Sequence, residues 1–114
     1  MPNYVLILHD DGSRIQGLSP DQMQAVIQRY VAWRKKISTG RTVTGHKLRD
    51  GQGRVMRGAG GSSVTDGPYA EAREVIGGLF VVEGKDYDDV VNLCNDCPHL
   101  DFGTIEIRET QPTS

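Results

Sequence analysis

The chain has 114 residues, 37% of them hydrophobic, which suits one domain with a single core. A formal net charge of −2 argues against nucleic-acid or membrane partners, because such partners require clustered positive charge. No apolar run approaches the roughly twenty residues that span a bilayer, and two cysteines are too few for a disulfide-stapled secreted scaffold. We expect one cytoplasmic domain over residues 1–114.

The first third of the chain predicts a strand followed by an amphipathic helix. Pro2 through His9 is rich in β-favouring residues and apolar on both faces, as in a central strand. Ser19 is a suitable N-cap for a helix whose first position is Pro20, and apolar residues at helical spacing continue to Ile37. Gly40 is expected to close this helix.

The middle of the chain is rich in turn residues. Residues 42–44 return to extended structure, and residues 49–53 predict a hairpin-type turn. A short return strand is expected at residues 54–57, followed by a flexible connector at 58–63. The glycines of this connector lack the Lys-Ser/Thr pair of a phosphate-binding loop.

The second half predicts a strand, a helix and a strand. Val75 to Glu83 forms a buried strand, in which Gly77 and Gly78 permit close approach of another backbone. Asp86 caps the helix and residues 104–108 alternate as a half-exposed strand. The residues expected to face inward on this helix, before Pro98 ends it, are Val90, Val91, Leu93 and Cys94.

This order of elements is the split βαβ pattern of a ferredoxin-like α+β sandwich, with an antiparallel sheet covered by helices on one face. The other face of such a sheet needs a partner. We therefore expect a homodimer that associates through the sheet.

Ionisable groups and turn residues concentrate at residues 65–74. Asp66 precedes a Gly-Pro turn that can fix its carboxylate, and Tyr69 and Glu71 follow closely. One interpretation is a solvated loop. The other is the wall of a polar site, with Asp66 moving protons while Tyr69 and Glu71 bind substrate.

Cys94 and Cys97 permit redox, metal and packing interpretations. The end of a helix does not lower a thiol pKa, which disfavours redox chemistry. A zinc site would need a further ligand such as His9 or His46, so we predict no metal and no cofactor. Packing in the core is the favoured account of both thiols.

His99 follows the last helix and is the main candidate proton carrier. A carboxylate such as Asp66 or Asp96 would orient its imidazole. His9 ends the first strand and is expected to face the same cleft as a substrate-binding group. The alternative for His99 is a contact with the terminal carbonyl groups of the preceding helix.

The stretch Asp66-Gly67-Pro68-Tyr69 resembles the signature of the YCII-related family, in the branch named for its Asp-Gly-Pro-Phe (DGPF) motif, with tyrosine in place of phenylalanine. The resemblance implies the dimeric α+β barrel fold and a histidine–aspartate pair. Asp96 lies near the aspartate position, whereas Gln22 stands close to the position of the histidine. The other segments that resemble the family are residues 4–8, 40–48, 97–100 and 105–108.

Two functions remain open at this point. The first is a small cofactor-free enzyme that performs acid/base chemistry on a small molecule in a cleft between sheet and helices, using Asp66, His99 and Asp96. The second is a noncatalytic module that binds a ligand or a protein. The resemblance implies for such a module a regulatory role linked to sigma factors.

Overall fold

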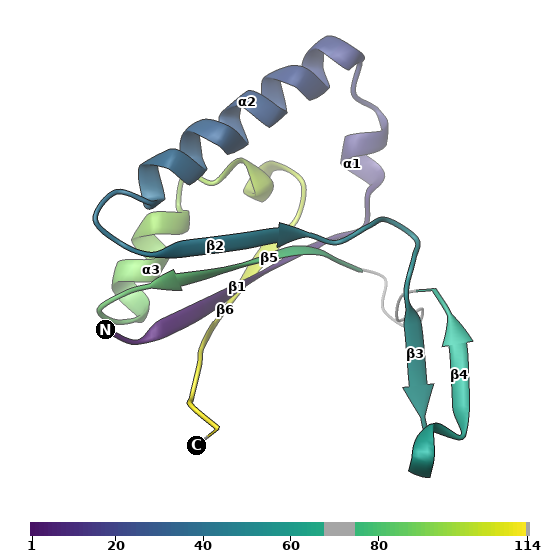
Figure 1. Cartoon of the computed structure of the whole chain (residues 1–114). Coiled ribbons are helices and arrows are strands. Elements are labelled where there is room, and N and C mark those ends of the chain that lie inside the picture. Colours follow the sequence, from purple (N-terminus) through teal and green to yellow (C-terminus); the bar gives the residue numbers. More distant parts are fainter. Residues whose placement is uncertain (68–74, 114) are drawn as a thin grey trace.

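A computed structural model describes residues 1–67 and 75–113 of the chain (Figure 1). Tyr69 and Glu71, two predicted substrate-binding residues, lie outside the described residues. The elements run in the order β1 (Asn3–Asp10), α1 (Ser13–Gln16), α2 (Pro20–Ile37), β2 (Val43–Lys47), β3 (Arg54–Arg57), η1 (Ala59–Gly61), β4 (Ser63–Asp66), β5 (Val75–Glu83), α3 (Tyr87–Cys94), η2 (Pro98–Asp101) and β6 (Thr104–Glu109).

The main sheet has four strands in the order β2-β5-β1-β6, and every neighbouring pair is antiparallel. Its two central strands are β1 and β5, the two predicted as buried. Helices α2 and α3 lie on the same side of the sheet (Figure 1). The predicted α+β fold is confirmed, whereas association through the sheet stays a prediction.

Helix α2 begins where the sequence predicts it. The Ser19 hydroxyl accepts a hydrogen bond from the backbone N–H of Gln22, and the Gln22 side chain accepts one from the N–H of Ser19. This reciprocal capping box satisfies two backbone donors that a helix start leaves free. Gln22, at the place where the family resemblance implies a histidine, therefore has a structural role.

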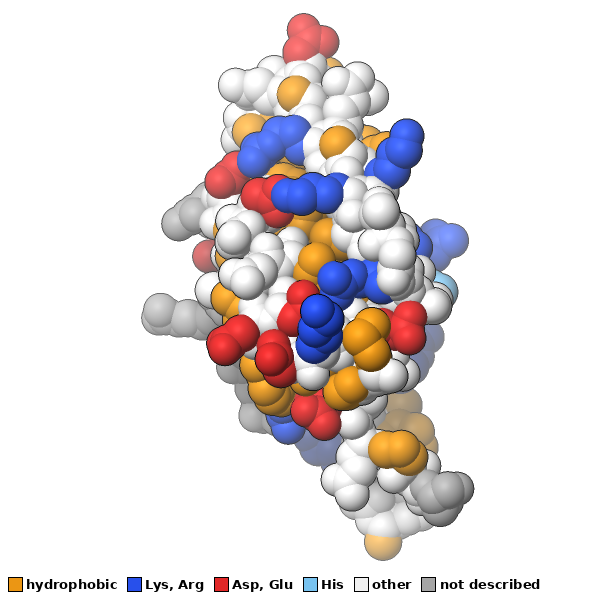
Figure 2. Space-filling view, turned by 90° about the vertical axis from the view of Figure 1, so that its left-hand side faces the viewer, with side chains coloured by type: hydrophobic (Ala, Val, Ile, Leu, Met, Phe, Trp, Pro, Cys, Tyr) orange, Lys and Arg blue, Asp and Glu red, His pale blue; other side chains and the backbone are white. Residues whose placement is uncertain are grey.

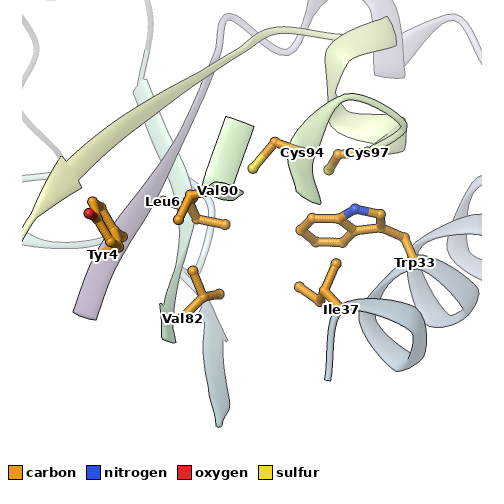
Figure 3. Close-up of a cluster of buried hydrophobic side chains, with 8 residues drawn as sticks. All are labelled: Tyr4, Leu6, Trp33, Ile37, Val82, Val90, Cys94 and Cys97. Atoms are coloured by element: carbon orange, nitrogen blue, oxygen red, sulfur yellow. The ribbon is translucent and has the colours of Figure 1, made fainter. Parts of the chain in front are cut away.

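The core lies between the sheet and the helices (Figure 3). Leu6 and Val82 on the central strands are fully buried, as is Val90 of α3. The Trp33 ring reaches in from α2, and its indole N–H donates to the carbonyl of Leu93 at 2.9 Å. Burial of these side chains is what holds the helices onto the sheet.

Cys94 and Cys97 belong to this core (Figure 3). Burial raises the pKa of the Cys94 thiol to about 12 and that of the Cys97 thiol to about 11. Thiols held protonated are poor nucleophiles and poor metal ligands. The predicted packing role of both residues is confirmed.

The sequence prediction for the middle of the chain is wrong in one respect. Residues 54–57 do form a strand, β3, but it pairs with β4 and not with the preceding strand. The hairpin turn lies in the predicted connector, where Gly58, Gly60 and Gly61 all have positive φ values that favour glycine. We call residues 54–66 the arm; Figure 1 shows it extending from one end of the sheet, away from α2.

The last helix also differs from its prediction. It ends at Cys94, one turn before Pro98, which instead begins the short helix η2. Val90 and Cys94 face inward as expected, but Val91 is 50% exposed. An eight-residue helix on the sheet turns only one stripe of side chains inward, and residue 91 lies outside that stripe.

Charged side chains of both signs mix on the surface that includes the end of α2 (Figure 2). Ion pairs there join Lys36 to Asp96 and Arg41 to Asp89. Among the described residues, no helix combines the length and apolar character required to cross a membrane.

Candidate functional site

His99, the predicted proton carrier, is 3% exposed and lies in η2 under helix α2. Its Nε2 atom is 2.9 Å from the backbone oxygen of His9, and its Nδ1 atom is 3.1 Å from the hydroxyl of Tyr30. A carbonyl only accepts, so Nε2 carries the proton and Nδ1 of the neutral ring accepts from the tyrosine. Both nitrogens of this imidazole are therefore engaged inside the protein.

Tyr30 is the α2 partner of this histidine. Burial, followed by the nearby Cys97 and Asp10, raises the pKa of the Tyr30 phenol far above its ordinary value. The hydroxyl therefore remains a hydrogen-bond donor throughout the physiological pH range. The Tyr30–His99 contact ties α2 to η2 and aligns the imidazole with the end of β1.

His9 carries its imidazole on the opposite face of the sheet. Side chains alternate along β1, and Leu6 and Leu8 point into the core, so His9 points away from the helices. The β1–β5 register shifts between Leu8 and His9, an irregularity that locally redirects a strand. This face of the sheet, which we call the open face, is the one that α2 and α3 leave uncovered.

On the open face, His9 contacts Glu106 of β6. The distance from His9 Nε2 to Glu106 Oε1 is 2.9 Å, and the side chains are 23% and 41% exposed. The hydrogen bond from His9, with a second from Arg108, lowers the pKa of Glu106 below its ordinary value. We call His9 and Glu106 the dyad; it joins an imidazole to an ionised carboxylate within reach of solvent.

The two histidines meet at one residue. His9 accepts a hydrogen bond from His99 through its backbone, while its side chain binds Glu106. The covalent structure of His9 thus joins two sets of hydrogen bonds, one to His99 and Tyr30 on the helix side and one to Glu106 on the open face. The buried imidazole can fix the backbone that carries the exposed one.

Apolar side chains from the central strands surround the dyad on the open face. Ile7 pairs directly with Glu106 across β1 and β6, and Ile76 pairs with His9 across β1 and β5. Ile76 is 46% exposed. The half-buried stripe farther along the two central strands consists of Val5, Ile7, Leu79 and Val81.

The structure places Asp66 away from His99. Asp66 ends β4 on the arm, its side chain is 88% exposed, and its carboxylate pairs with Arg54 at 3.2 Å. The proposed proton-transfer pair is therefore not present in this chain, because the imidazole is bound by Tyr30 and the His9 carbonyl. The turn that follows Asp66 in the sequence did not indicate that this residue would lie at the end of a strand on the arm.

Asp96 does not orient His99 either. Its carboxylate binds Lys36 of α2, which lowers the pKa of Asp96. The pair borders an open hollow of about 220 Å³ between α2 and the end of α3, with Trp33 and Pro98 in its lining. The partner of Asp96 is thus a lysine on the surface, and a role in catalysis stays a prediction without geometric support.

Sequence reasoning missed two members of the site, Tyr30 and Glu106. Alternation with Ile105 and Ile107 placed Glu106 on the outer face of the last strand. Which neighbour it meets depends on the β1–β6 register, which the sequence does not encode locally. In the sequence, Tyr30 is one of the helically spaced residues expected to face the core from α2. Only the position of η2 beneath that helix shows that its hydroxyl contacts His99.

Comparison with known proteins identifies the family of the chain. A model of the YCII-related domain matches residues 3–114. No curated protein matches the sequence.

Two solved structures resemble the fold. One is a 5-chloro-2-hydroxyhydroquinone dehydrochlorinase from Burkholderia phenoliruptrix in complex with 2,5-dihydroxybenzoquinone, at 12% identity and a TM-score of 0.49, covering 96% of this chain and 93% of that one. The other is a protein from Arabidopsis thaliana, at 13% identity and a TM-score of 0.42, covering 100% of this chain and 97% of that one. Neither likeness bears on activity.

Proposed function

The chain belongs to the YCII-related family, and from this premise we propose that it is a small enzyme performing acid/base chemistry on a small molecule bound at the open face. The observation that carries the proposal is the dyad. An imidazole held by a carboxylate, partly exposed and beside apolar side chains, has the composition of a general acid/base group and its orienting partner.

The role of each dyad member follows from its contacts. His9 Nε2 donates to Glu106, so Nδ1 is the nitrogen that accepts a proton from a bound molecule. Glu106 fixes the tautomer and stabilises the imidazolium that forms when the proton arrives. The lowered pKa of Glu106 keeps its carboxylate ionised, as this role demands.

The surroundings define the substrate class. Ile7 and Ile76 give the dyad apolar neighbours on both sides, which favours an aromatic or largely apolar molecule. The molecule must carry an acidic proton, on oxygen or on carbon next to a carbonyl, because the imidazole supplies only proton transfer. His99 and Tyr30 act as positioning residues through the His9 backbone and take no proton from the substrate.

The test is a proton-exchange screen. Small carbonyl compounds with an acidic C–H are incubated with the protein in deuterated water, and exchange of that C–H is followed by NMR. We expect His9→Gln to slow the exchange of any accelerated compound by about 100-fold or more, because general-base catalysis contributes about that much. Glu106→Gln should slow it less and shift its pH profile.

His46→Gln is the matched control. His46 is an exposed histidine on β2, on the opposite edge of the same sheet, and it should leave the exchange rate unchanged. An equal loss of exchange rate in the two histidine variants would show that the exchange does not depend specifically on His9. Exchange that survives His9→Gln in full contradicts the proposal.

The family branch and the alternative function can be considered beside this proposal. The Asp66-Gly67-Pro68 sequence supports placing the chain in the DGPF branch, with Tyr69 as a departure from the motif. Among the described residues, no specific contact favours the alternative of a noncatalytic module linked to sigma factors. Asp66→Asn is therefore expected to leave exchange unchanged, since its carboxylate pairs with Arg54 on the arm.

A further inference from the structure

A positively charged side chain lies beside the dyad on the open face. Arg108 follows Glu106 by two residues on β6, and side chains two positions apart on a strand share a face of the sheet. The distance from Arg108 Nη1 to Glu106 Oε2 is 3.2 Å, whereas His9 Nε2 contacts the other carboxylate oxygen, Oε1, at 2.9 Å. One carboxylate therefore has an imidazole on one side and a guanidinium on the other.

The strand register shows that these two side chains converge. Across β1 and β6, Arg108 pairs with Val5, which is four residues before His9. Four residues of strand span about 13 Å. Both side chains nonetheless reach Glu106, so their tips approach each other. The open-face residue between Val5 and His9 on β1 is Ile7, which is apolar and half-buried.

The guanidinium of Arg108 has more hydrogen-bond donors than its contact with Glu106 uses. Arginine carries five N–H groups in a planar fork that matches the geometry of a carboxylate. Within residues 1–67 and 75–113, Glu106 is the one side chain with which Arg108 forms an ion pair. The Arg108 side chain is 69% exposed, and exposed ion pairs contribute little free energy. A carboxylate of a bound molecule can therefore reach the fork at small cost.

The charges of the three side chains also favour an anion. While His9 is neutral, the positive charge of Arg108 cancels the negative charge of Glu106. Once His9 has taken a proton from a bound molecule, the three groups together carry one net positive charge. The bound molecule becomes more negative in the same step, so the electrostatic match is best at that moment.

We propose that Arg108 binds a carboxylate of the substrate, and that the substrates are carboxylic acids with an acidic C–H next to a ketone carbonyl. This inference rests on the proposed function, because it names the substrate class of the same site. The apolar part of the molecule covers Ile7 and Leu79, which pair directly across β1 and β5. The carboxylate binds the guanidinium, and the reacting carbon meets His9.

The proton transfer balances without any further reactant. The C–H bond of the substrate breaks, its proton moves to Nδ1 of His9, and its electron pair passes into the carbonyl group to form an enolate. The reverse step returns a proton to the same carbon, or a deuteron when the imidazole has exchanged with deuterated water. Arg108 takes no proton, because its guanidinium stays charged throughout.

The first test compares phenylpyruvate with its methyl ester. Both carry a benzylic C–H next to a ketone carbonyl, but only the acid has a carboxylate. Exchange of that C–H in deuterated water is followed by NMR, and the rate without protein is subtracted. We expect Arg108→Gln to raise the half-saturating concentration of phenylpyruvate about tenfold or more, because a charge-assisted contact is lost. Exchange of the ester should stay unchanged, which would show that the dyad is intact.

Arg29→Gln is the matched control. Arg29 of α2 is 53% exposed and pairs with one carboxylate, that of Asp101, at 2.8 Å, so its substitution removes a similar charge away from the open face. It should leave the exchange of both compounds unchanged. Arg108→Lys keeps the charge without the planar fork and should weaken the binding of phenylpyruvate less than Arg108→Gln does.

A binding measurement separates this inference from the proposed function. Benzoate has a carboxylate on an apolar ring but no C–H next to a ketone, and benzamide is its neutral counterpart. In an NMR titration, benzoate should shift the Arg108 Nε–H and His9 ring signals, and it should bind Arg108→Gln about tenfold more weakly or worse.

The outcomes of the two tests are distinct. Benzoate binding that depends on Arg108, without exchange of any compound, would support the carboxylate site and contradict the proposed function. Exchange that depends on His9 but is unaffected by Arg108→Gln would do the reverse. Benzoate that does not bind, or that binds Arg108→Gln as well as it binds the wild-type chain, overturns the inference.

Discussion

The two faces of the main sheet use histidine in different ways. On the helix-covered face, His99 is 3% exposed and both of its ring nitrogens bind groups of the protein. On the open face, His9 is 23% exposed and binds one carboxylate. Burial with two partners gives a structural imidazole, whereas partial exposure with one partner leaves a nitrogen for chemistry.

The largest expected difference between the faces is in stability. Leu6 and Ile7 are neighbours on β1, but Leu6 is fully buried under the helices and Ile7 lies half-buried on the open face. Leu6→Ala should lower the free energy of unfolding by about 3 to 5 kcal/mol, through lost burial and the cavity left behind. Ile7→Ala should cost clearly less in dilute solution, measured by urea unfolding. Equal losses would show that both faces are covered in the monomer.

Substitution of the two histidines should also affect stability unequally, with the larger loss again on the helix-covered face. His99→Ala leaves the Tyr30 hydroxyl and the His9 carbonyl without their partner, at a cost of about 2 to 3 kcal/mol. His9→Ala removes a partly exposed ion pair and should cost less than about 1 kcal/mol. Thermal and urea unfolding of both variants provide the comparison. A larger loss for His9→Ala would reverse the roles assigned here.

The thiols provide a chemical measure of the covered face. A pKa of about 11 for Cys97, against an ordinary 9.0, lowers its thiolate fraction at pH 8 about 100-fold. The rate of alkylation in the native protein should therefore fall at least that far below the rate in denaturant. Because the native pKa lies above the unfolded one, the thiol contribution to stability is intact below pH 9 and is lost as the pH rises toward about 11. A native thiol that reacts at the denatured rate contradicts this account.

The smallest effect concerns the titration of Glu106 on the open face. The hydrogen bond from His9 is the largest cause of its lowered pKa, and the hydrogen bond from Arg108 is the next largest. His9→Gln should raise this pKa toward its ordinary value, and by more than Arg108→Gln does. Carboxyl chemical shifts followed by NMR against pH give both values. If His9→Gln leaves the pKa of Glu106 unchanged, the His9–Glu106 hydrogen bond does not form in solution.

The predictable parts of the fold rest on local chemistry. Ser19 and Asp86 cap their helices through side-chain bonds to backbone N–H groups three residues on, an interaction within a single turn. Strand β5 was predicted with the bounds that the structure shows, because its residues are apolar over a length typical of a buried strand. Such features depend on neighbours in sequence.

The arm and the site were not predictable in the same way. The sequence predicted a hairpin turn at residues 49–53 and a connector at 58–63, whereas the pairing of β3 with β4 places the hairpin turn in that connector. Asp66, Asp96 and His99 suggested a site through proximity in sequence or family resemblance. Their actual partners, Arg54, Lys36 and Tyr30, come from other elements.

The sequence by itself determined the α+β class, the capped helices and the buried central strands, because propensity, periodicity and capping act over a few residues. Only the tertiary structure decided that His99 is enclosed and that His9 meets Glu106. Both outcomes depend on strand register and on the packing of η2 beneath α2, which join residues 69 to 97 positions apart. Contacts over such separations are set by the whole core, so no local pattern announces them.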